Sequence, residues 1–253
     1  MQPLGRNQGS YCGERIHVAE VLGAIGEAAE RAGWGSEVFL DEESRQLFAL
    51  TLRPRQTLKK VYISAGIHGD EPAGPMAVLQ LLRAHEWPED TAVWLCPCLN
   101  PTGFRRNYRE NAERVDLNRD YRSPVTLEIM AHTDWLNRQP SFDFGVHLHE
   151  DWESKGFYLY ELNPNEVPAK SREMIDAVQQ VCPVDQSAEI EGWGANHGVI
   201  HPPVKPHERK EWPEAFFMVQ SKTMISYTLE APSDFPLTMR VAALQTAVNT
   251  LLR

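Results

Sequence analysis

Alternation of strand-like and helix-like segments constrains the fold of this sequence more than any other feature. Short apolar runs predict strands at residues 61–67, 92–98, 142–148, 157–162 and 224–229. Longer patterned segments predict helices at 75–85, 125–138, 167–181 and 236–252. This order favours an α/β domain with a mostly parallel or mixed sheet between helices. In such folds ligands bind beyond the carboxyl ends of the strands.

The N-terminal part of the chain is expected to extend the same domain. A helix is predicted at about residues 15–31, and alternating segments at 36–40 and 46–52 predict a hairpin or two edge strands. A length of 253 residues fits one large domain. We therefore predict that 1–55 form a helix and edge strands attached to a core at 56–253.

Composition excludes several classes of protein. The net charge of −10 argues against a nucleic-acid partner. No stretch approaches the ~20 apolar residues that span a bilayer, and the polar N-terminus carries no signal-peptide core, so a cytoplasmic protein without membrane contact is expected. The sequence carries no signal for an oligomeric state. The four cysteines are Cys12, Cys96, Cys98 and Cys182. Their spacing matches no zinc or redox motif, so they are expected to be buried free thiols.

Polar clusters follow four of the predicted strands, where an active site at the sheet edge requires them. They are His68-Gly69-Asp70-Glu71, Asn100-Pro101-Thr102-Gly103, His147-Leu148-His149-Glu150-Asp151, and Glu230. An arginine-rich loop follows the second cluster in the sequence, and its simplest interpretation is that it lies on the surface, exposed to solvent.

His68 and Glu71 lie three residues apart just after a strand, where a turn into a helix can aim both side chains at one point. An imidazole and a carboxylate are competent zinc ligands, and a third ligand leaves one position for water. Strand alternation puts His147 and His149 on one face, so either histidine is a candidate for the third ligand.

The order of these motifs resembles the zinc metallocarboxypeptidase family, including its bacterial branches and the related desuccinylase and aspartoacylase enzymes. The resemblance rests on the segments His68–Glu71, Asn100–Gly103, Asp116–Arg119, His149 and Thr228–Glu230. It implies an eight-stranded mixed sheet between helices and one zinc ion per chain.

The resemblance also implies a role for each matching residue. His68, Glu71 and His149 would bind the zinc ion, and Glu230 would be the general base. Arg109 would polarise the scissile carbonyl. The remaining two residues, which would bind a substrate carboxylate, are Asn118 and Arg119.

The sequence departs from the family pattern in two places. The family commonly has Asp-x-His before the third ligand, whereas this chain has His147-Leu148-His149. Either His147 replaces that aspartate or, if His147 is the ligand, Gly145 does; the following Glu150-Asp151 favours His149. A tyrosine upstream of the general base has no clear counterpart. Residues 192–214 are a candidate source of its replacement; the polar residues there, mostly expected to be solvated, are Asn196, His197, His201 and His207.

The sequence thus predicts a zinc hydrolase that cleaves an amide bond next to a substrate carboxylate, favouring a metallocarboxypeptidase that acts on small peptides. The alternative is an N-acyl amino acid deacylase. Only 253 − 230 = 23 residues follow Glu230, too few for the C-terminal β-domain usual in aspartoacylases, so the first interpretation is preferred. A non-catalytic carboxylate-binding protein and a structural zinc domain are less favoured, because no ligand or base is missing and no cysteines adjoin the candidate ligands.

Overall fold

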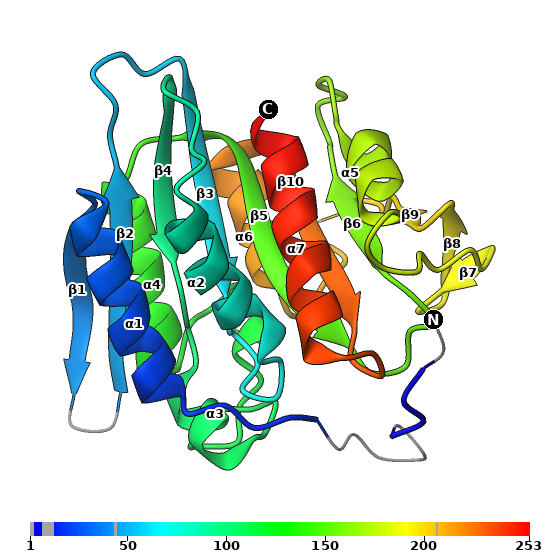
Figure 1. Cartoon of the computed structure of the whole chain (residues 1–253), viewed down its shortest axis with the longest axis horizontal. Coiled ribbons are helices and arrows are strands. Elements are labelled where there is room, and N and C mark those ends of the chain that lie inside the picture. The colour runs from blue at the N-terminus through cyan, green and yellow to red at the C-terminus, as the bar shows by residue number, and fades with distance from the viewer. Residues whose placement is uncertain (1–2, 7–12, 43–44, 206) are drawn as a thin grey trace.

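The computed structural model describes residues 3–6, 13–42, 45–205 and 207–253. Its centre is one large mixed sheet flanked by helices (Figure 1). The helices are α1 (Val18–Arg31), α2 (Ala73–Ala84), α3 (Pro101–Arg106), α4 (Leu127–Arg138), α5 (Ser171–Val178), α6 (Glu214–Ser221) and α7 (Leu237–Leu252), with a 3-10 turn at Leu117–Arg119. The strands are β1 (Gly35–Glu42), β2 (Arg45–Leu52), β3 (Lys59–Ala65), β4 (Thr91–Cys96), β5 (Phe142–Asp151), β6 (Tyr158–Leu162), β7 (Glu189–Ile190), β8 (Trp193–Asn196), β9 (Val199–Ile200) and β10 (Thr223–Pro232).

Four parallel strands form the middle of the sheet. The strand order is β1-β2-β4-β3-β5-β10-β6-β9-β8-β7, and β4, β3, β5 and β10 run in the same direction. Strands β2 and β6 pair antiparallel with the outer members of this group. The carboxyl ends of β3, β5 and β10 therefore meet at one edge, which is where three of the predicted polar clusters lie.

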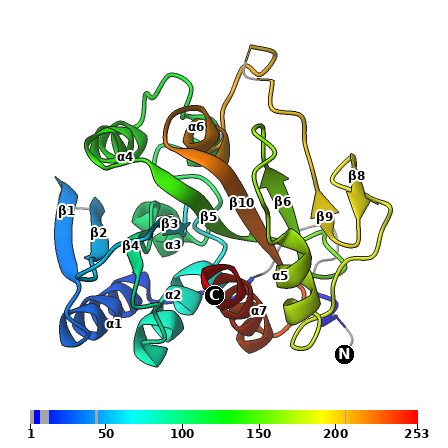
Figure 2. The same cartoon turned by 90° about the horizontal axis from the view of Figure 1, so that it is seen from above.

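Helices cover both faces of the sheet. Helices α1, α2, α5 and α7 lie on one side, and α4 and α6 lie on the other (Figure 2). The larger apolar cluster lies beneath the first group and includes Val61, Ile63, Val146 and Leu148. The opposite face of the same strands carries Tyr62, Ser64, His147 and His149, and it is this more polar face that leads to the candidate site.

The predicted α/β architecture is confirmed, with differences at element boundaries that have local causes. Strand β4 stops at Cys96 because Pro97 has no N–H for the ladder. Helix α5 begins only at Ser171, because Pro168 disfavours the helical conformation at Val167, the expected first residue. Helix α4 begins after Thr126, whose hydroxyl accepts a hydrogen bond from the backbone N–H of Ile129.

The described sheet has ten strands, whereas the family resemblance implied eight. The shortest strands, β7, β8 and β9, are two to four residues long and continue the sheet beyond β6, which accounts for the larger number. No helix in the described part of the chain is long and apolar enough to cross a membrane. Cys96, Cys98 and Cys182 are buried free thiols as predicted, and Cys12 lies outside the described residues.

Candidate active site

Two glycines shape the turn that carries His68 and Glu71. Gly66 ends the β3 segment with a φ of +63°, a conformation that favours glycine. Gly69 packs directly against another backbone segment, because a Cβ placed on it would lie 2.1 Å from the carbonyl carbon of Gly103. The turn therefore fits against the start of α3 only with glycine at position 69.

Asn100 joins this turn to the loop that carries Arg109. Its Oδ1 atom accepts a hydrogen bond from the backbone N–H of Gly103 at 2.8 Å and so caps α3. Its Nδ2 group donates to the carbonyl oxygens of Ile67 and Arg109, both at 3.1 Å. The Asn100–Gly103 motif thus holds two functional loops together instead of contacting a ligand itself.

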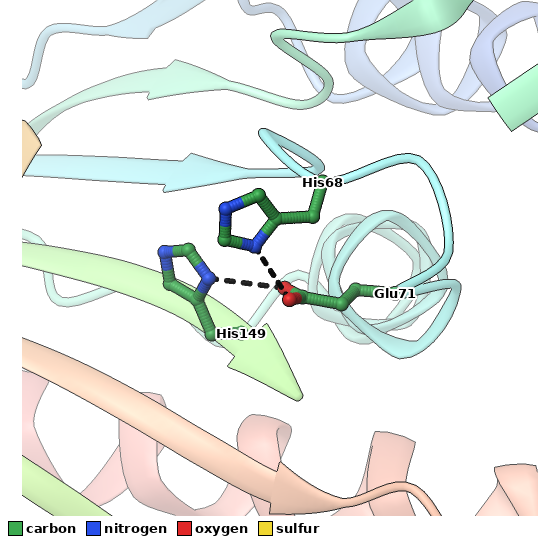
Figure 3. A group of neighbouring side chains, drawn as sticks. All are labelled: His68, Glu71 and His149. Atoms are coloured by element: carbon green, nitrogen blue, oxygen red, sulfur yellow. Dashed lines mark hydrogen bonds and ion pairs between the residues drawn. The ribbon is translucent and has the colours of Figure 1, made fainter. Parts of the chain in front are cut away.

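His68, Glu71 and His149 converge at the sheet edge (Figure 3). The Nδ1 atom of His68 lies 2.5 Å from Glu71 Oε1, and the Nδ1 atom of His149 lies 3.0 Å from Glu71 Oε2. One potential ligand atom from each residue lies within 4.8 Å of the others, and all three residues are buried. Two imidazoles and one carboxylate form a donor set that fits zinc.

The charges in this group support one another. Burial opposes ionisation of Glu71, but the adjacent His68 and His149 bring the pKa of its carboxyl well below the usual range. For His68, burial lowers the pKa, yet the Glu71 and Asp116 carboxylates together outweigh it and the net pKa is raised. The pKa of His149 is lowered because burial outweighs the attraction of Glu71. Glu71 is thus an ionised carboxylate between two imidazoles, and such a group can bind a cation when the imidazoles are neutral.

Asp116 holds His68 from its other side. Its Oδ1 atom lies 3.2 Å from His68 Nε2 and accepts the backbone N–H of Asn118 at 2.9 Å. Its Oδ2 atom accepts a hydrogen bond from Arg109 Nε at 3.0 Å. Asp116 is thus ion-paired with Arg109 as well as in contact with His68. With Nε2 held by Asp116, the Nδ1 atom of His68 is left to face Glu71.

Glu230 lies across the same edge, on β10. It is the register partner of His149 on β5 and of Tyr158 on β6. The structure gives its carboxylate no hydrogen bond or ion pair to another described residue. Burial, followed by the nearby Glu71 carboxylate, raises the pKa of Glu230 well above its ordinary value. A carboxylate with a raised pKa is better able to accept and return a proton near neutral pH.

These residues line one cavity of about 760 Å³. Asn118 and Arg119 reach it from the 3-10 turn, and Arg109 reaches it from the preceding loop. Other lining residues include Tyr158, Tyr160, Trp152, Trp193, Arg209 and Thr228. All seven site residues predicted from the sequence are therefore brought to one cavity.

The sequence profile of the succinylglutamate desuccinylase/aspartoacylase catalytic domain matches residues 57–184, which is 128 of the 253 residues. The chain belongs to this family. The matched range contains His68, Glu71, Asp116 and His149, whereas Glu230 lies beyond it. Both the order of the motifs and the α/β fold agree with the resemblance drawn from the sequence.

Solved structures share the fold of this desuccinylase/aspartoacylase family member. A candidate metallopeptidase of Shewanella amazonensis SB2B is 24% identical and superposes with a TM-score of 0.82 over 96% of this chain and 97% of that chain. A metallo-carboxypeptidase of Burkholderia cenocepacia is 18% identical, with a TM-score of 0.71 over 94% of this chain and 69% of that chain. A sequence relative, Carboxypeptidase SOL1 of Arabidopsis thaliana, is 38% identical over an alignment of 107 residues. The alignment covers 33% of this chain and only 21% of that protein's length.

His147 lies apart from the three converging side chains. Its Nδ1 atom is 2.8 Å from Ser64 Oγ and 3.1 Å from Glu214 Oε2, and its Nε2 atom is 2.8 Å from Ser226 Oγ. All of these partners are protein groups on the sheet face below the cavity. Of the two candidates for the third metal-type residue, the structure therefore places His149, and not His147, beside Glu71.

The segment 192–214 contributes to the cavity in a way that the sequence did not indicate. His197 contacts Gln186 and His201 lies 3.7 Å from Glu161, both outside the cavity lining. The segment instead supplies Trp193 and Arg209 to the lining, and the tyrosines there come from β6. In the strand predicted at 157–162, Phe157 and Leu159 are buried in the core, whereas Tyr158 and Tyr160 line the cavity.

A buried ion pair lies next to the group formed by His68, Glu71 and His149. Glu150, next to His149, accepts the backbone N–H of Ala73 at the start of α2 at 2.5 Å and pairs with Arg240 of α7. Burial raises the pKa of Glu150 to about 7, although Arg240 acts in the opposite direction. Arg240 also pairs with Glu14 of the N-terminal segment. Because these partners lie far apart along the chain, no local pattern predicts this arrangement.

Proposed function

We propose that this protein is a zinc-dependent hydrolase that cleaves an amide bond next to a substrate carboxylate, as a metallocarboxypeptidase of small peptides. The observation that carries the proposal is the convergence of His68, Glu71 and His149 within 4.8 Å in a cavity that also holds a carboxylate and arginines. No simple structural role needs this combination. The fold of metallopeptidase-like neighbours supports the same conclusion.

The three converging residues would hold one zinc ion per chain. Their nitrogen and oxygen donors match catalytic zinc sites, and Asp116 orients one imidazole from the far side. When bound, zinc supplies Lewis-acid chemistry that polarises a carbonyl and acidifies water. Three protein ligands leave a coordination position open for that chemistry.

The other cavity residues supply binding and proton transfer. Arg119 offers a planar fork of donors to a carboxylate, and Asn118 lies beside it. Arg109 brings a positive charge to the neighbourhood of Glu71, where an oxyanion would develop. Glu230 would accept a proton from water and return it to the leaving amine. The substrate would thus be a small peptide or N-acyl amino acid with a free carboxylate.

A second activity, N-acyl amino acid deacylation, is favoured by a separate observation. The family to which the chain belongs is named for a desuccinylase and an aspartoacylase. Both activities break an amide bond near a carboxylate, so the same residues would serve either. A protein that binds carboxylates without catalysis is disfavoured because neither the general base nor any of the three metal-type residues is missing.

Metal analysis and a substrate panel test the proposal together. The purified protein is loaded with zinc, dialysed and analysed for metal, and short peptides and N-acyl amino acids are then offered with and without a chelator. We expect about one zinc per chain and release of an amino acid that the chelator abolishes. The best substrate separates peptidase from deacylase, and failure to retain stoichiometric metal would contradict the proposal.

A further inference from the structure

Glu214, the first residue of α6, lies beneath the cavity and outside its lining. It is 1% exposed, and its carboxylate accepts hydrogen bonds from Tyr62 Oη at 2.7 Å and Ser64 Oγ at 2.8 Å. His147 Nδ1 lies 3.1 Å from its Oε2 atom. A buried carboxylate is costly unless such partners surround it. The first residue of α6 is therefore fixed to the polar face of β3 and β5.

The contacts of His147 extend this attachment to a third strand. Its Nε2 atom lies 2.8 Å from Ser226 Oγ of β10, opposite the nitrogen that faces Glu214. Ser64, His147 and Ser226 come from β3, β5 and β10, which are neighbours in the parallel part of the sheet. Burial opposes ionisation of Glu214, but His147, His132 and the hydrogen bond from Tyr62 together lower the pKa of its carboxyl to about 2.

The backbone of Glu214 acts directly on Asn118. Its N–H donates to Asn118 Oδ1 at 2.8 Å, which commits the oxygen of that amide to α6. The Nδ2 group, a donor, makes no hydrogen bond to a described residue, and Asn118 lines the cavity beside Arg119. A carboxylate only accepts hydrogen bonds, so it needs the NH₂ end of the amide and is repelled by the oxygen end.

We propose that Glu214, anchored by Tyr62, Ser64 and His147, is the positioning residue that turns Asn118 to donate to the substrate carboxylate. The inference rests on the proposed function in assigning a carboxylate to Asn118 and Arg119. Strand β5 then has two tasks two residues apart: His149 faces the cation site and His147 supports the carboxylate site. The separation of the two sites is fixed by one strand, which selects substrates whose scissile amide lies close to the acid group.

Paired ligands test this inference without requiring turnover. Binding of benzoylglycine and of benzoylglycinamide, which differ only in carboxylate against carboxamide, is measured by calorimetry on the zinc-loaded protein. The wild type should bind the acid at least tenfold more tightly. Asn118→Asp, which keeps the acceptor for the Glu214 N–H and replaces the donor by an oxygen, should abolish or invert that preference.

Glu214→Asp, whose shorter side chain cannot reach all three partners, should reduce the preference about tenfold, and Glu214→Gln should reduce it less. With the best substrate and its carboxamide, the loss should appear in KM for the acid, with kcat and zinc content retained. Glu161→Gln, a change at another buried carboxylate that lies outside the cavity, is the matched control and should keep the wild-type preference.

The outcomes separate this inference from the proposed function. Acid preference that is lost in Asn118→Asp and Glu214→Asp, in a protein without chelator-sensitive hydrolysis, supports the positioning role and contradicts the enzyme. If the wild type hydrolyses its substrate but Asn118→Asp still prefers the acid over the amide as the wild type does, the positioning role is overturned and the proposed function stands. A wild type that binds both ligands equally also overturns it. If Glu214→Asp does not fold, Asn118→Asp and Glu214→Gln still decide.

Discussion

The Nε2 atom of His68 lies 3.2 Å from Oδ1 of Asp116, on the opposite side of the ring from Glu71. This contact fixes the ring before any cation arrives, because both ring nitrogens have a carboxylate partner. Such support from behind a ligand commonly changes metal affinity by about 10–100-fold. Asp116 is therefore part of the candidate metal centre although it supplies no ligand atom to the converging group.

Asp116→Asn should weaken zinc binding by about 10–100-fold, since the variant loses the negative charge that faces His68 and Arg109. Competition with a chromophoric chelator measures the change. Asp120→Asn is the matched control: Asp120 lies in the same loop but accepts hydrogen bonds from the backbone N–H groups of Val125 and Thr126. It should keep wild-type zinc affinity, and an equal loss in both variants would contradict a specific role for Asp116.

Glu230→Gln should retain zinc and lose turnover by about 10²–10⁴-fold, because the amide cannot accept a proton from water. His68→Ala should lose both, since it removes one of the three converging groups. Metal analysis beside the activity assay distinguishes the two variants. An active Glu230→Gln protein would exclude this residue as the general base.

Gly69→Ala should destabilise the protein by about 1–3 kcal/mol, the usual range for overpacking, and lower zinc occupancy. The new Cβ would lie 2.1 Å from the Gly103 carbonyl carbon and 2.3 Å from the Phe104 nitrogen, so backbone must move. Gly26→Ala is the contrasting change, because no atom lies within 4 Å of a Cβ at that position in α1. Denaturant unfolding should show it to be stabilising by about 0.5–1 kcal/mol.

The buried imidazole of His132 should make the free energy of unfolding depend on pH between about 6.5 and 4. Burial lowers the pKa of this imidazole from 6.5 to about 4, and Tyr62 and Tyr121 bind its two nitrogens. The unfolded chain therefore binds more protons between these values, so the stabilising contribution is complete above pH 6.5 and is lost as the pH falls towards 4. At pH 5 the loss is about 2 kcal/mol.

Urea unfolding at pH 7 and pH 5 checks this prediction. His132→Gln removes the titrating group and keeps a donor and an acceptor, so it should lose about 2 kcal/mol less than the wild type between the two pH values. Equal losses in the two proteins would show that other groups govern acid unfolding in this range.

Arg240→Met should destabilise the protein by up to about 3–5 kcal/mol, because Glu150 is left in the interior without its cation. The pKa of Glu150, already raised to about 7 by burial, should rise further in the variant. Since a group with a raised pKa stabilises the folded state less as the pH rises through that pKa, stability should fall between pH 6 and pH 8 by more in the variant than in the wild type. Unfolding free energies at the two pH values measure this, and a cost independent of pH would show that Glu150 stays charged.

The local pattern predicted most of the fold and the His68–Glu71 pair because both depend on short-range signals, whereas His149 came from the family resemblance. Val61–Ile67 is an apolar run ending in glycine and isoleucine, and His68 and Glu71 follow within one turn. Alternation along β5 left His147 and His149 open, the family pattern favoured His149, and tertiary contacts distinguish the two side chains. Ser64 and Glu214, the partners that distinguish His147, lie on other elements far before it and far after it in the chain, and no periodicity links such distant positions.

The short elements escaped prediction for a related reason. Strands β7 and β9 have two residues each, too few for an alternating pattern to emerge. Helix α6 places Phe216, Phe217 and Met218 in succession, so its sequence has no helical stripe, and its place is set by Glu214. Tertiary contacts decide such segments.

The position of β10 has a consequence for biosynthesis. This strand, which carries Glu230, is the last strand in the chain but inserts between β5 and β6, both of which are synthesised well before it. A nascent chain therefore exposes the facing edges of β5 and β6 until β10 has left the ribosome. Unpaired strand edges invite pairing with other chains. Aggregation during translation should be sensitive to how quickly the segment that carries β10 is made, and the candidate site is complete only once Glu230 has been synthesised.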